Sequence, residues 1–338
     1  MNILFYCPFV INLNDNRNYP LGGIESLNIE LAKEIAKTKH NVYLASFTKK
    51  TFSKDNVLNI PIKNILNKHN QYIFDMIISS NDPSIFDKYK NSKKFFWMHN
   101  TLSLEKSLRK RKFLPLLTNK ITTIFVSKYL RNITSRLYLF NKNIVIPNFL
   151  SHQFTSSRIN SKRKPIFVWS VQREKGLKET IQTWIDQIYP INNKAKLYIL
   201  GINKMPNWFK SKTFLKKNIH FFGRVGKKKL KEIYQKSMGM ICLGYDETFC
   251  LNAVESYACG LPILTFGLTA VSEISTKKNS FRGSNFNHIY KHIIFLSKMN
   301  AKSRKKLIDN CVNFSKKYYI KNVIGKWVKL LKVSPNVK

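Results

Sequence analysis

The chain has 338 residues, a formal net charge of +41 and a hydrophobic fraction of 43%. This length exceeds what one hydrophobic core usually serves, so we expect two domains of about 150 residues each. The 24 Phe and 15 Tyr residues supply enough apolar surface for two cores, which excludes an intrinsically disordered chain.

The excess of positive charge points to an anionic partner: nucleic acid, an anionic lipid surface or a phosphorylated substrate. The lysines, however, are scattered along almost every segment, with short basic clusters such as those at 109–112 and 227–231. Scattered lysine is typical of a solvated surface, and a compositional drift toward Lys, Asn and Ile would also produce it. The alternative is a basic face that holds the protein on an anionic membrane, at roughly 1 kcal/mol per well-placed cation.

The cysteines and the N-terminal residues indicate a reducing compartment. Five cysteines occur without any CxxC pair, so neither a disulfide framework nor a zinc site is predicted. The first residues lack a basic leader and a small-residue cleavage site, and no stretch reaches about 18 apolar residues. We therefore expect a cytoplasmic protein, with any membrane association peripheral.

The first half of the chain alternates predicted strands and helices. Residues 2–10 form a short apolar run, and a Gly-Gly loop then leads into an amphipathic helix at 24–36 and a second strand at 41–47. This is a βαβ unit with a glycine loop at the carboxyl end of its first strand. Further strand-like runs continue the alternation, which predicts a parallel sheet covered on both faces within a domain at 1–150.

The second half repeats this organisation. Residues 151–164 are polar and poor in large apolar residues, which predicts a linker. The alternation of strands and helices then restarts and defines a second α/β domain at 165–317. The remaining residues, 318–338, include an amphipathic helical segment that either packs back on the N-terminal domain or lies on a membrane surface.

Several polar or flexible residues follow predicted strands, where open parallel sheets bind their ligands. Gly22 and Gly23 can bring backbone N–H groups close to an anion, although a Gly pair also fits an ordinary tight turn. Arg173 and Lys175 stand between a strand and a helix, where a planar fork and a compact charge suit a diphosphate. His99 ends a strand and is either a ligand-facing side chain or a satisfied core histidine.

Two of the few acids lie eight positions apart in the segment 245–267. This segment predicts a loop, a helix, a turn and a buried strand, with Glu247 in the loop and Glu255 about one turn inside the helix. Either acid alone could simply complement the positive end of the helix. His288 and His292 have helical spacing but no acidic third ligand nearby, so we predict no metal site.

The order of these features resembles the retaining glycosyltransferases of the GT-B type, family 4. This resemblance rests on the glycine pair, the strand-end histidine, the cations of Arg-x-Lys-Gly and the Glu-x7-Glu motif before ACGLP, and it extends from Asn2 to about Trp327. Its most specific part is ETFCLNAVESYACGLPILTFG, at 247–267. It implies an α/β fold of two Rossmann-like domains facing a cleft, with a nucleotide-diphosphate sugar bound mainly on the second domain and the acceptor on the first.

The resemblance also implies roles in the second domain. Glu255 would accept hydrogen bonds from the ribose hydroxyls, and Glu247 would act as a catalytic residue that holds hydroxyls of the donor sugar. The backbone amides that would face the sugar and phosphate belong to Phe249, Cys250 and Leu251. Cys250 stands where the family usually has a glycine, which crowds this loop.

The remaining implied roles concern the phosphates and the reacting centre. Arg173 and Lys175 would neutralise the departing diphosphate without a divalent metal, although the family usually places its arginine further ahead of the lysine. Gly22 and Gly23 would close on the same phosphates. His99 would lie near the donor sugar as a catalytic residue.

The predicted activity is transfer of a sugar from a donor such as a UDP- or GDP-sugar, with retention of anomeric configuration, to a saccharide, lipid-linked or other surface-glycan acceptor. Surface polysaccharide or lipopolysaccharide synthesis at the inner face of the membrane fits this activity, and no cofactor is expected. The alternatives are a nucleic-acid-binding protein and an inactive, glycosyltransferase-like binding protein. A nucleotide-sugar epimerase is the nearest enzymatic rival, but it would lack the full Glu-x7-Glu pattern.

Overall fold

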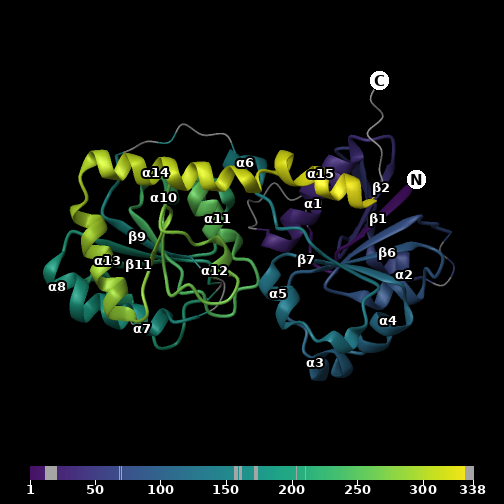
Figure 1. Cartoon of the computed structure of the whole chain (residues 1–338), viewed down its shortest axis with the longest axis horizontal. Coiled ribbons are helices and arrows are strands. Elements are labelled where there is room, and N and C mark those ends of the chain that lie inside the picture. The colour runs from purple at the N-terminus through teal and green to yellow at the C-terminus, as the bar shows by residue number, and fades with distance from the viewer. Residues whose placement is uncertain are drawn as a thin grey trace. The chain divides into compact units, whose positions relative to one another are not determined.

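A computed structural model describes residues 1–11, 21–67, 69, 71–155, 159, 162–170, 174–202, 204–209 and 211–331. The chain divides into two compact units (Figure 1). Unit 1 comprises Met1–Ser151 together with Ile320–Lys338, and unit 2 comprises His152–Tyr319. The last helix therefore belongs to the same unit as the first strand.

Unit 1 is built on a sheet whose order is β3-β4-β2-β1-β5-β6-β7-β8. All neighbouring strands in it are parallel except β3 and β4, which form an antiparallel edge. The central strands are almost entirely buried because both faces of a parallel sheet are covered. The strands are β1 (Asn2–Tyr6), β2 (Asn41–Ser46), β3 (Phe52–Lys54), β4 (Val57–Pro61), β5 (Met76–Ser80), β6 (Lys93–Met98), β7 (Ile121–Phe125) and β8 (Lys142–Val145).

The helices of unit 1 connect these strands. They are α1 (Gly23–Ala36), α2 (Ile62–Leu66), α3 (Leu104–Arg109), α4 (Phe113–Thr118) and α5 (Lys128–Ile133), with the 3₁₀ turns η1 (Pro83–Asp87) and η2 (Arg136–Tyr138). The C-terminal helix α15 (Ile320–Leu331) contacts α1. It buries Val323, Trp327 and Leu331, and the Trp327 ring packs edge-on against Trp97 at 4.7 Å between ring centroids. The apolar face of this amphipathic helix is thus used in packing unit 1.

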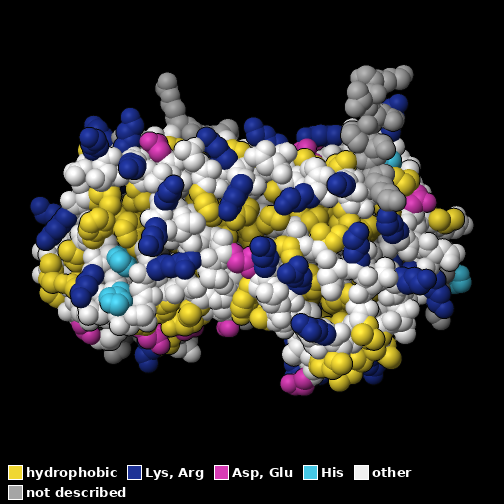
Figure 2. Space-filling model, in the orientation of Figure 1, with side chains coloured by type: hydrophobic (Ala, Val, Ile, Leu, Met, Phe, Trp, Pro, Cys, Tyr) yellow, Lys and Arg dark blue, Asp and Glu magenta, His cyan; other side chains and the backbone are white. Residues whose placement is uncertain are grey.

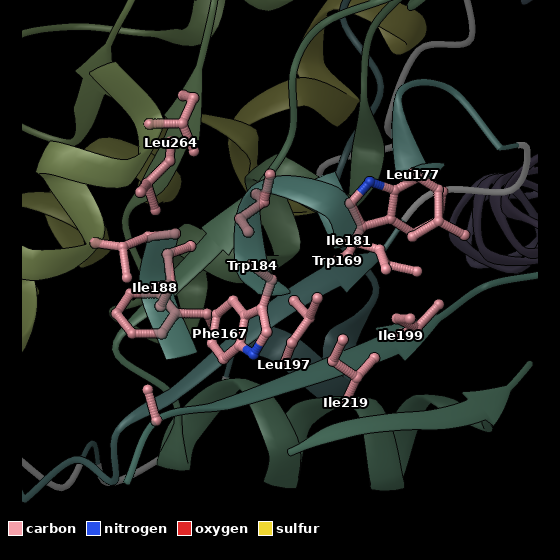
Figure 3. Packing of buried hydrophobic residues seen from close by; sticks show 14 of the residues in the cluster. Phe167, Trp169, Leu177, Ile181, Trp184, Ile188, Leu197, Ile199, Ile219 and Leu264 are labelled. Carbon is pink, nitrogen blue, oxygen red and sulfur yellow. The ribbon is translucent and has the colours of Figure 1, made fainter. Parts of the chain in front are cut away.

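Unit 2 contains a fully parallel sheet in the order β11-β10-β9-β12-β13-β14. A core of large side chains lies against one of its faces, and Figure 3 shows Trp169, Trp184 and Phe167 in this cluster. The Phe167 and Trp184 rings are 6.2 Å apart between centroids. The strands are β9 (Ile166–Ser170), β10 (Lys196–Leu200), β11 (Ile219–Gly223), β12 (Gly239–Ile241), β13 (Ile263–Thr265) and β14 (Ser280–Arg282).

The helices of unit 2 include two that contribute to the site described below. These are α10 (Lys227–Lys236) and α11 (Leu251–Ala258). The others are α6 (His152–Thr155), α7 (Leu177–Thr183), the π-helical turn η3 (Trp184–Ile188), α8 (Tyr189–Ile191), α9 (Ser211–Leu215), α12 (Val271–Ile274), α13 (Phe286–Lys298), α14 (Ala301–Ser315) and the 3₁₀ turn η4 (Lys316–Tyr318). The two parallel-sheet units confirm the predicted α/β class with two Rossmann-like domains.

The polar stretch 151–164 carries more structure than its composition predicts. Residues 152–155 form α6, and the Phe154 side chain is buried. Arg163 is also engaged: its Nη1 donates to the Tyr234 carbonyl oxygen and its Nη2 to that of Cys259, each at 2.8 Å. An apolar side chain, Phe154, and a charged one, Arg163, are thus both held within unit 2.

Lys and Arg side chains are distributed over the whole face seen in Figure 2 rather than gathered at one place. The scatter expected from the sequence is therefore visible on this face. Across the part of the chain that the structure describes, no helix is long and apolar enough to cross a bilayer.

Candidate functional site

The site in unit 2 begins where β9 ends. Ser170, the last residue of β9, accepts a hydrogen bond on its backbone oxygen from the Asn252 side-chain amide at 2.7 Å, and its hydroxyl accepts one from the Tyr234 hydroxyl at 2.9 Å. Asn252 lies in the first turn of α11. The amino end of α11 is therefore tied to the carboxyl end of a central strand, the edge at which parallel sheets bind ligands.

Lys175 and Glu247 form an ion pair in the loops beside this point. Lys175 Nζ donates to Glu247 Oε1 at 2.7 Å and to the Asp246 carbonyl oxygen at 3.1 Å. The two side chains are 14% and 16% exposed, so solvent screens the pair only partly. A cation and an acid that lie far apart in the sequence are thus brought into direct contact.

The loop that carries Glu247 is held by its own hydrogen bonds. The Glu247 N–H donates to Thr269 Oγ1 at 3.3 Å, and Thr269 Oγ1 donates to the Gly244 carbonyl oxygen at 2.6 Å. Gly244 has φ of +93°, and a Cβ there would lie 2.9 Å from the Leu268 carbonyl oxygen. Only glycine fits this position without moving the neighbouring backbone.

Glu255 is buried inside α11. Its residue is 3% exposed, and its Oε1 lies 4.0 Å from Lys227 Nζ at the start of α10. Burial raises the pKa of the Glu255 carboxyl from 4.5 to about 7, while the Lys227 charge acts in the opposite direction. A carboxyl with this pKa is close to half ionised at neutral pH, and its ionised form can accept two hydroxyl hydrogen bonds.

The backbone at the start of α11 has an unusual conformation. Cys250, the residue before the helix, has φ of +65° and ψ of +69°, and its side chain makes no capping hydrogen bond. The first-turn N–H groups of a helix have no partner within the helix, and they lie at its positive end. The Phe249 side chain is buried and its ring contacts Tyr318 at 5.6 Å between centroids. Leu251 opens the helix and is half-buried.

The candidates in unit 1 lie at the start of helix α1 and just after strand β6. Gly22 precedes α1, and the Glu25 carboxylate packs against it, in the space that a Cβ on Gly22 would occupy. His99 follows β6 and is buried, with its ring 4.5 Å from that of Trp97 between centroids. Burial lowers the pKa of the His99 imidazole to about 3, which keeps the ring neutral at physiological pH.

The structure brings the unit 2 candidates to one end of the sheet: Lys175, Glu247, Phe249, Cys250, Leu251 and Glu255. Arg173 lies outside the described residues. Two residues that the sequence did not single out belong here, because Asn252 anchors α11 to β9 and Lys227 faces Glu255. Lys227 was visible as the first residue of a basic cluster, but only its position at the start of α10 distinguishes it from the surrounding lysines.

No metal-binding group is apparent in the described part of the chain, where no three His, Cys, Asp or Glu side chains lie close enough together to hold an ion. His288 Nδ1 instead contacts the Ser284 hydroxyl at 3.1 Å, and His292 Nε2 contacts the Arg282 carbonyl oxygen at 2.9 Å. Metal independence stays a prediction.

Solved structures define the class of the fold. Sucrose-phosphate synthase from Thermosynechococcus elongatus is similar with a TM-score of 0.75 and 14% identity, over 98% of both chains. WaaG, a glycosyltransferase involved in lipopolysaccharide biosynthesis, has a TM-score of 0.70 and 13% identity, over 98% of this chain and 100% of WaaG. Anabaena HepE in complex with UDP and glucose has a TM-score of 0.71 and 11% identity, over 98% of this chain and 99% of HepE. The chain has the GT-B fold.

The second half of the chain also matches a protein family in sequence. Residues 151–313 match the family described as glycosyl transferases group 1, and this region contains all the unit 2 candidates. No curated protein matches the chain in sequence. The family match supports a glycosyltransferase over residues 151–313, and the solved structures support the fold.

Proposed function

We propose that the protein is a retaining glycosyltransferase that moves a sugar from a nucleotide-diphosphate sugar to a saccharide, lipid-linked or other surface-glycan acceptor. The observation that carries the proposal is that the Lys175–Glu247 ion pair lies in the loops before the amino end of α11, while Glu255 is buried within the same helix. Acids that can accept hydroxyl hydrogen bonds thus lie beside a cation and backbone N–H groups that suit phosphate.

In the proposed mechanism the ionised Glu255 accepts hydrogen bonds from the ribose hydroxyls of the donor. Lys175 and the first N–H groups of α11, from Leu251 onward, stabilise the negative charge that develops on the departing diphosphate. Phe249 and Cys250 contribute backbone amides on the approach to the helix. Because Lys175 is paired with Glu247 in this structure, donor binding must redirect both side chains, Lys175 to phosphate and Glu247 to the sugar hydroxyls.

The other residues keep roles that rest on the family resemblance alone. Arg173 assists Lys175 at the diphosphate, and Gly22 and Gly23 present backbone N–H groups to phosphate. A phosphate there would displace the Glu25 carboxylate, which packs against this turn. His99 contributes its neutral ring or its backbone near the reacting carbon, and its low pKa excludes a charged imidazolium in that role at neutral pH. No nucleophile is assigned.

Thermal unfolding with nucleoside diphosphates tests the proposal. UDP, GDP, ADP and CDP are each added to the wild type, to Glu255→Ala and to the control Glu179→Ala, which alters an exposed acid on α7. One diphosphate at about 100 times its dissociation constant should stabilise the wild type and the control by about 2.7 kcal/mol, and should lose its effect on Glu255→Ala. If no diphosphate stabilises the wild type, or if Glu255→Ala responds equally, the proposed donor site is wrong.

Retention and the acceptor need a product. Nucleotide sugars that carry the base of the stabilising diphosphate are then tested as donors. Nuclear magnetic resonance of the first-formed product gives its anomeric configuration. An inverted product would contradict a retaining mechanism.

The nucleic-acid alternative is tested by adding a short single-stranded DNA in the same thermal unfolding series. Salt-dependent stabilisation by DNA alone would favour that alternative.

We also propose peripheral association with an anionic membrane, through an exposed apolar face on unit 1. This α3–α4 face consists of the exposed side chains Leu108, Leu114, Leu117, Leu137 and Leu139, which are between 37% and 79% exposed. Figure 2 shows hydrophobic side chains gathered where Figure 1 places α3 and α4. The basic cluster 109–112 lies within it, and leucines interleaved with cations are typical of surfaces that rest in the lipid headgroup region.

The α3–α4 face is one surface because its elements are joined. α4 contacts both α3 and η2. The Tyr138 hydroxyl of η2 donates to the carbonyl oxygens of Leu102 and Ser103, at 3.0 and 3.1 Å, just before α3. Helix α15, the other segment considered for membrane binding, has its apolar face buried in unit 1, so it does not serve as the membrane-facing element in this proposal.

A further inference from the structure

A hollow in unit 2 lies away from the donor site. It encloses about 400 Å³, a volume at the lower end of the range for small-ligand pockets. We call it the lysine groove because five lysines line it: Lys164, Lys194, Lys196, Lys229 and Lys236. One acid, Glu232, also lines it and lies 3.9 Å from Lys229. Five cations against one anion give the groove a strongly positive potential.

The groove has a structured wall. Lys196 and Tyr198 of β10 point to the same face of the sheet because they are two residues apart. The Tyr198 ring lies 4.8 Å from that of Phe222 on the edge strand β11, between centroids. Phe222 is 41% exposed, so this aromatic pair presents an apolar surface beside the ammonium groups. Ile166 and Ile233 complete the apolar lining.

Backbone hydrogen bonds fix the elements around the groove. The Lys164 N–H donates to the Lys236 carbonyl oxygen at 2.7 Å, which joins the start of β9 to the end of α10. The Lys196 N–H donates to the Pro165 carbonyl oxygen at 2.8 Å, which joins β9 to β10. Three of the lysines therefore project from positions that are set by the sheet and the helix.

The groove is distinct from the donor site. It opens at the amino end of β9, beside Ile166, whereas Asn252 of the donor site is bonded to Ser170 at the carboxyl end of the same strand. Four steps along a strand span about 13 Å at roughly 3.3 Å per residue. A ligand in the groove would not occupy the position of the donor.

We propose that the lysine groove binds an anionic saccharide, that is, a sugar chain whose units carry carboxylate or phosphate groups. The apolar C–H face of a sugar ring fits the Tyr198–Phe222 surface, and ammonium groups accept carboxylate or phosphate in many orientations. Single-stranded nucleic acid uses the same two kinds of group, but it needs a track of several stacking rings along an extended groove. One aromatic pair in a small hollow fits one or a few sugar units better. This site goes beyond the proposed transfer reaction and does not depend on it.

Calorimetric titration with trigalacturonate, which has three carboxylates, tests the proposal against neutral maltotriose. The wild type should bind trigalacturonate and not maltotriose, with an affinity that falls as salt rises. The double variant Lys196→Gln/Lys236→Gln should bind at least about tenfold more weakly, the effect of losing one charge-assisted hydrogen bond. Phe222→Ala should also bind more weakly, because the sugar ring loses its apolar wall.

Matched variants outside the groove separate a site from general surface charge. Lys291→Gln/Lys298→Gln and Phe295→Ala change exposed residues of α13, and both should bind trigalacturonate as the wild type does. If this lysine pair loses as much affinity as the groove pair, or if maltotriose binds equally well, the proposal is wrong. Tighter binding of a short oligothymidylate that depends on the same two groove lysines would assign the groove to nucleic acid instead.

Two further measurements distinguish binding in the lysine groove from binding at the donor site. Bound trigalacturonate should protect Lys196 and Lys236 from acetylation, as mapped by mass spectrometry, and a nucleoside diphosphate should not compete with it. Competition by the diphosphate, with protection at Lys175 instead, would mean that the saccharide occupies the donor site and would overturn the proposal. Absence of any nucleotide binding would leave the groove result unchanged while contradicting the proposed transferase.

Discussion

Glu255 is a carboxyl whose burial should be measurable in the stability of the protein. Its folded-state pKa of about 7 exceeds its ordinary value of 4.5, so the folded protein holds this proton more tightly than the unfolded chain does. The resulting stabilisation is complete below pH 4.5 and is lost as pH rises through about 7. For a shift of this size the loss is on the order of 3 kcal/mol.

The variant Glu255→Gln should lack this pH dependence. Its free energy of unfolding relative to wild type, from urea denaturation, should rise by on the order of 3 kcal/mol between pH 4.5 and about pH 8. Glu179→Gln, at an exposed position of α7, should show no such trend. A constant difference between Glu255→Gln and wild type across this range would mean that the Glu255 pKa is not raised.

Cys250 occupies a backbone conformation that favours glycine. Its φ of +65° lies in the left-handed region, where a Cβ costs about 1 kcal/mol. Cys250→Gly and Cys250→Ala both remove the thiol that lies 3.3 Å from Cys242 Sγ, but only glycine removes the strain. We therefore expect Cys250→Gly to be more stable than Cys250→Ala by about 1 kcal/mol in urea denaturation. Equal stabilities would show that the left-handed conformation carries no strain here.

At the scale of elements, Arg163 holds the carboxyl ends of two helices together. Its guanidinium donates to Tyr234 near the end of α10 and to Cys259 at the end of α11, where the last carbonyl groups have no partner within a helix. Arg163→Met should lower the free energy of unfolding by about 3 kcal/mol, because buried carbonyl groups lose charged donors. Lys162→Met, at the exposed neighbouring position, should change it little. An equal effect of the two substitutions would refute the capping role.

Local sequence patterns predict some of the helices and strands but not the contacts between them. Periodicity and apolar runs predicted the βαβ start, the parallel sheets and the helix carrying Glu255, because these depend on local patterns. The role of Arg163 was not predictable, because a polar stretch gives no local sign that one of its side chains reaches two helix ends. Composition alone made residues 151–164 a linker, whereas burial of Phe154 and the bonds of Arg163 tie parts of it to unit 2.

The same limit applies to the site. The motif residues Glu247 and Glu255 were identified from their spacing, and the position of each relative to α11 was predicted correctly. The contact between Lys175 and Glu247 was not, because no local pattern links residues 72 positions apart. Lys227 looked like one of many scattered lysines, and only the packing of α10 beside α11 brings it to Glu255.

At the scale of the whole molecule, the effect of the net charge of +41 depends on where the basic side chains lie on the surface. The basic side chains are widely distributed in Figure 2, so charge alone would give only weak, salt-sensitive attraction to any polyanion. Apolar side chains add a contribution that salt does not screen. A membrane contact through the α3–α4 face should therefore depend on both its leucines and its basic cluster, whereas a purely electrostatic contact would depend on charge alone.

Co-sedimentation with lipid vesicles separates these cases. Wild type should bind vesicles containing phosphatidylglycerol and not vesicles of phosphatidylcholine alone. Arg109→Gln/Lys110→Gln should weaken binding by about 1 kcal/mol per charge, and Leu114→Ser/Leu137→Ser should weaken it at high salt as well, because burial of these exposed side chains in the headgroup region is lost. The controls Lys302→Gln/Lys305→Gln on α14 and Leu215→Ser on α9 change exposed residues of unit 2. Equal losses in the control and α3–α4 variants would mean that the whole basic surface, and not this face, meets the lipid.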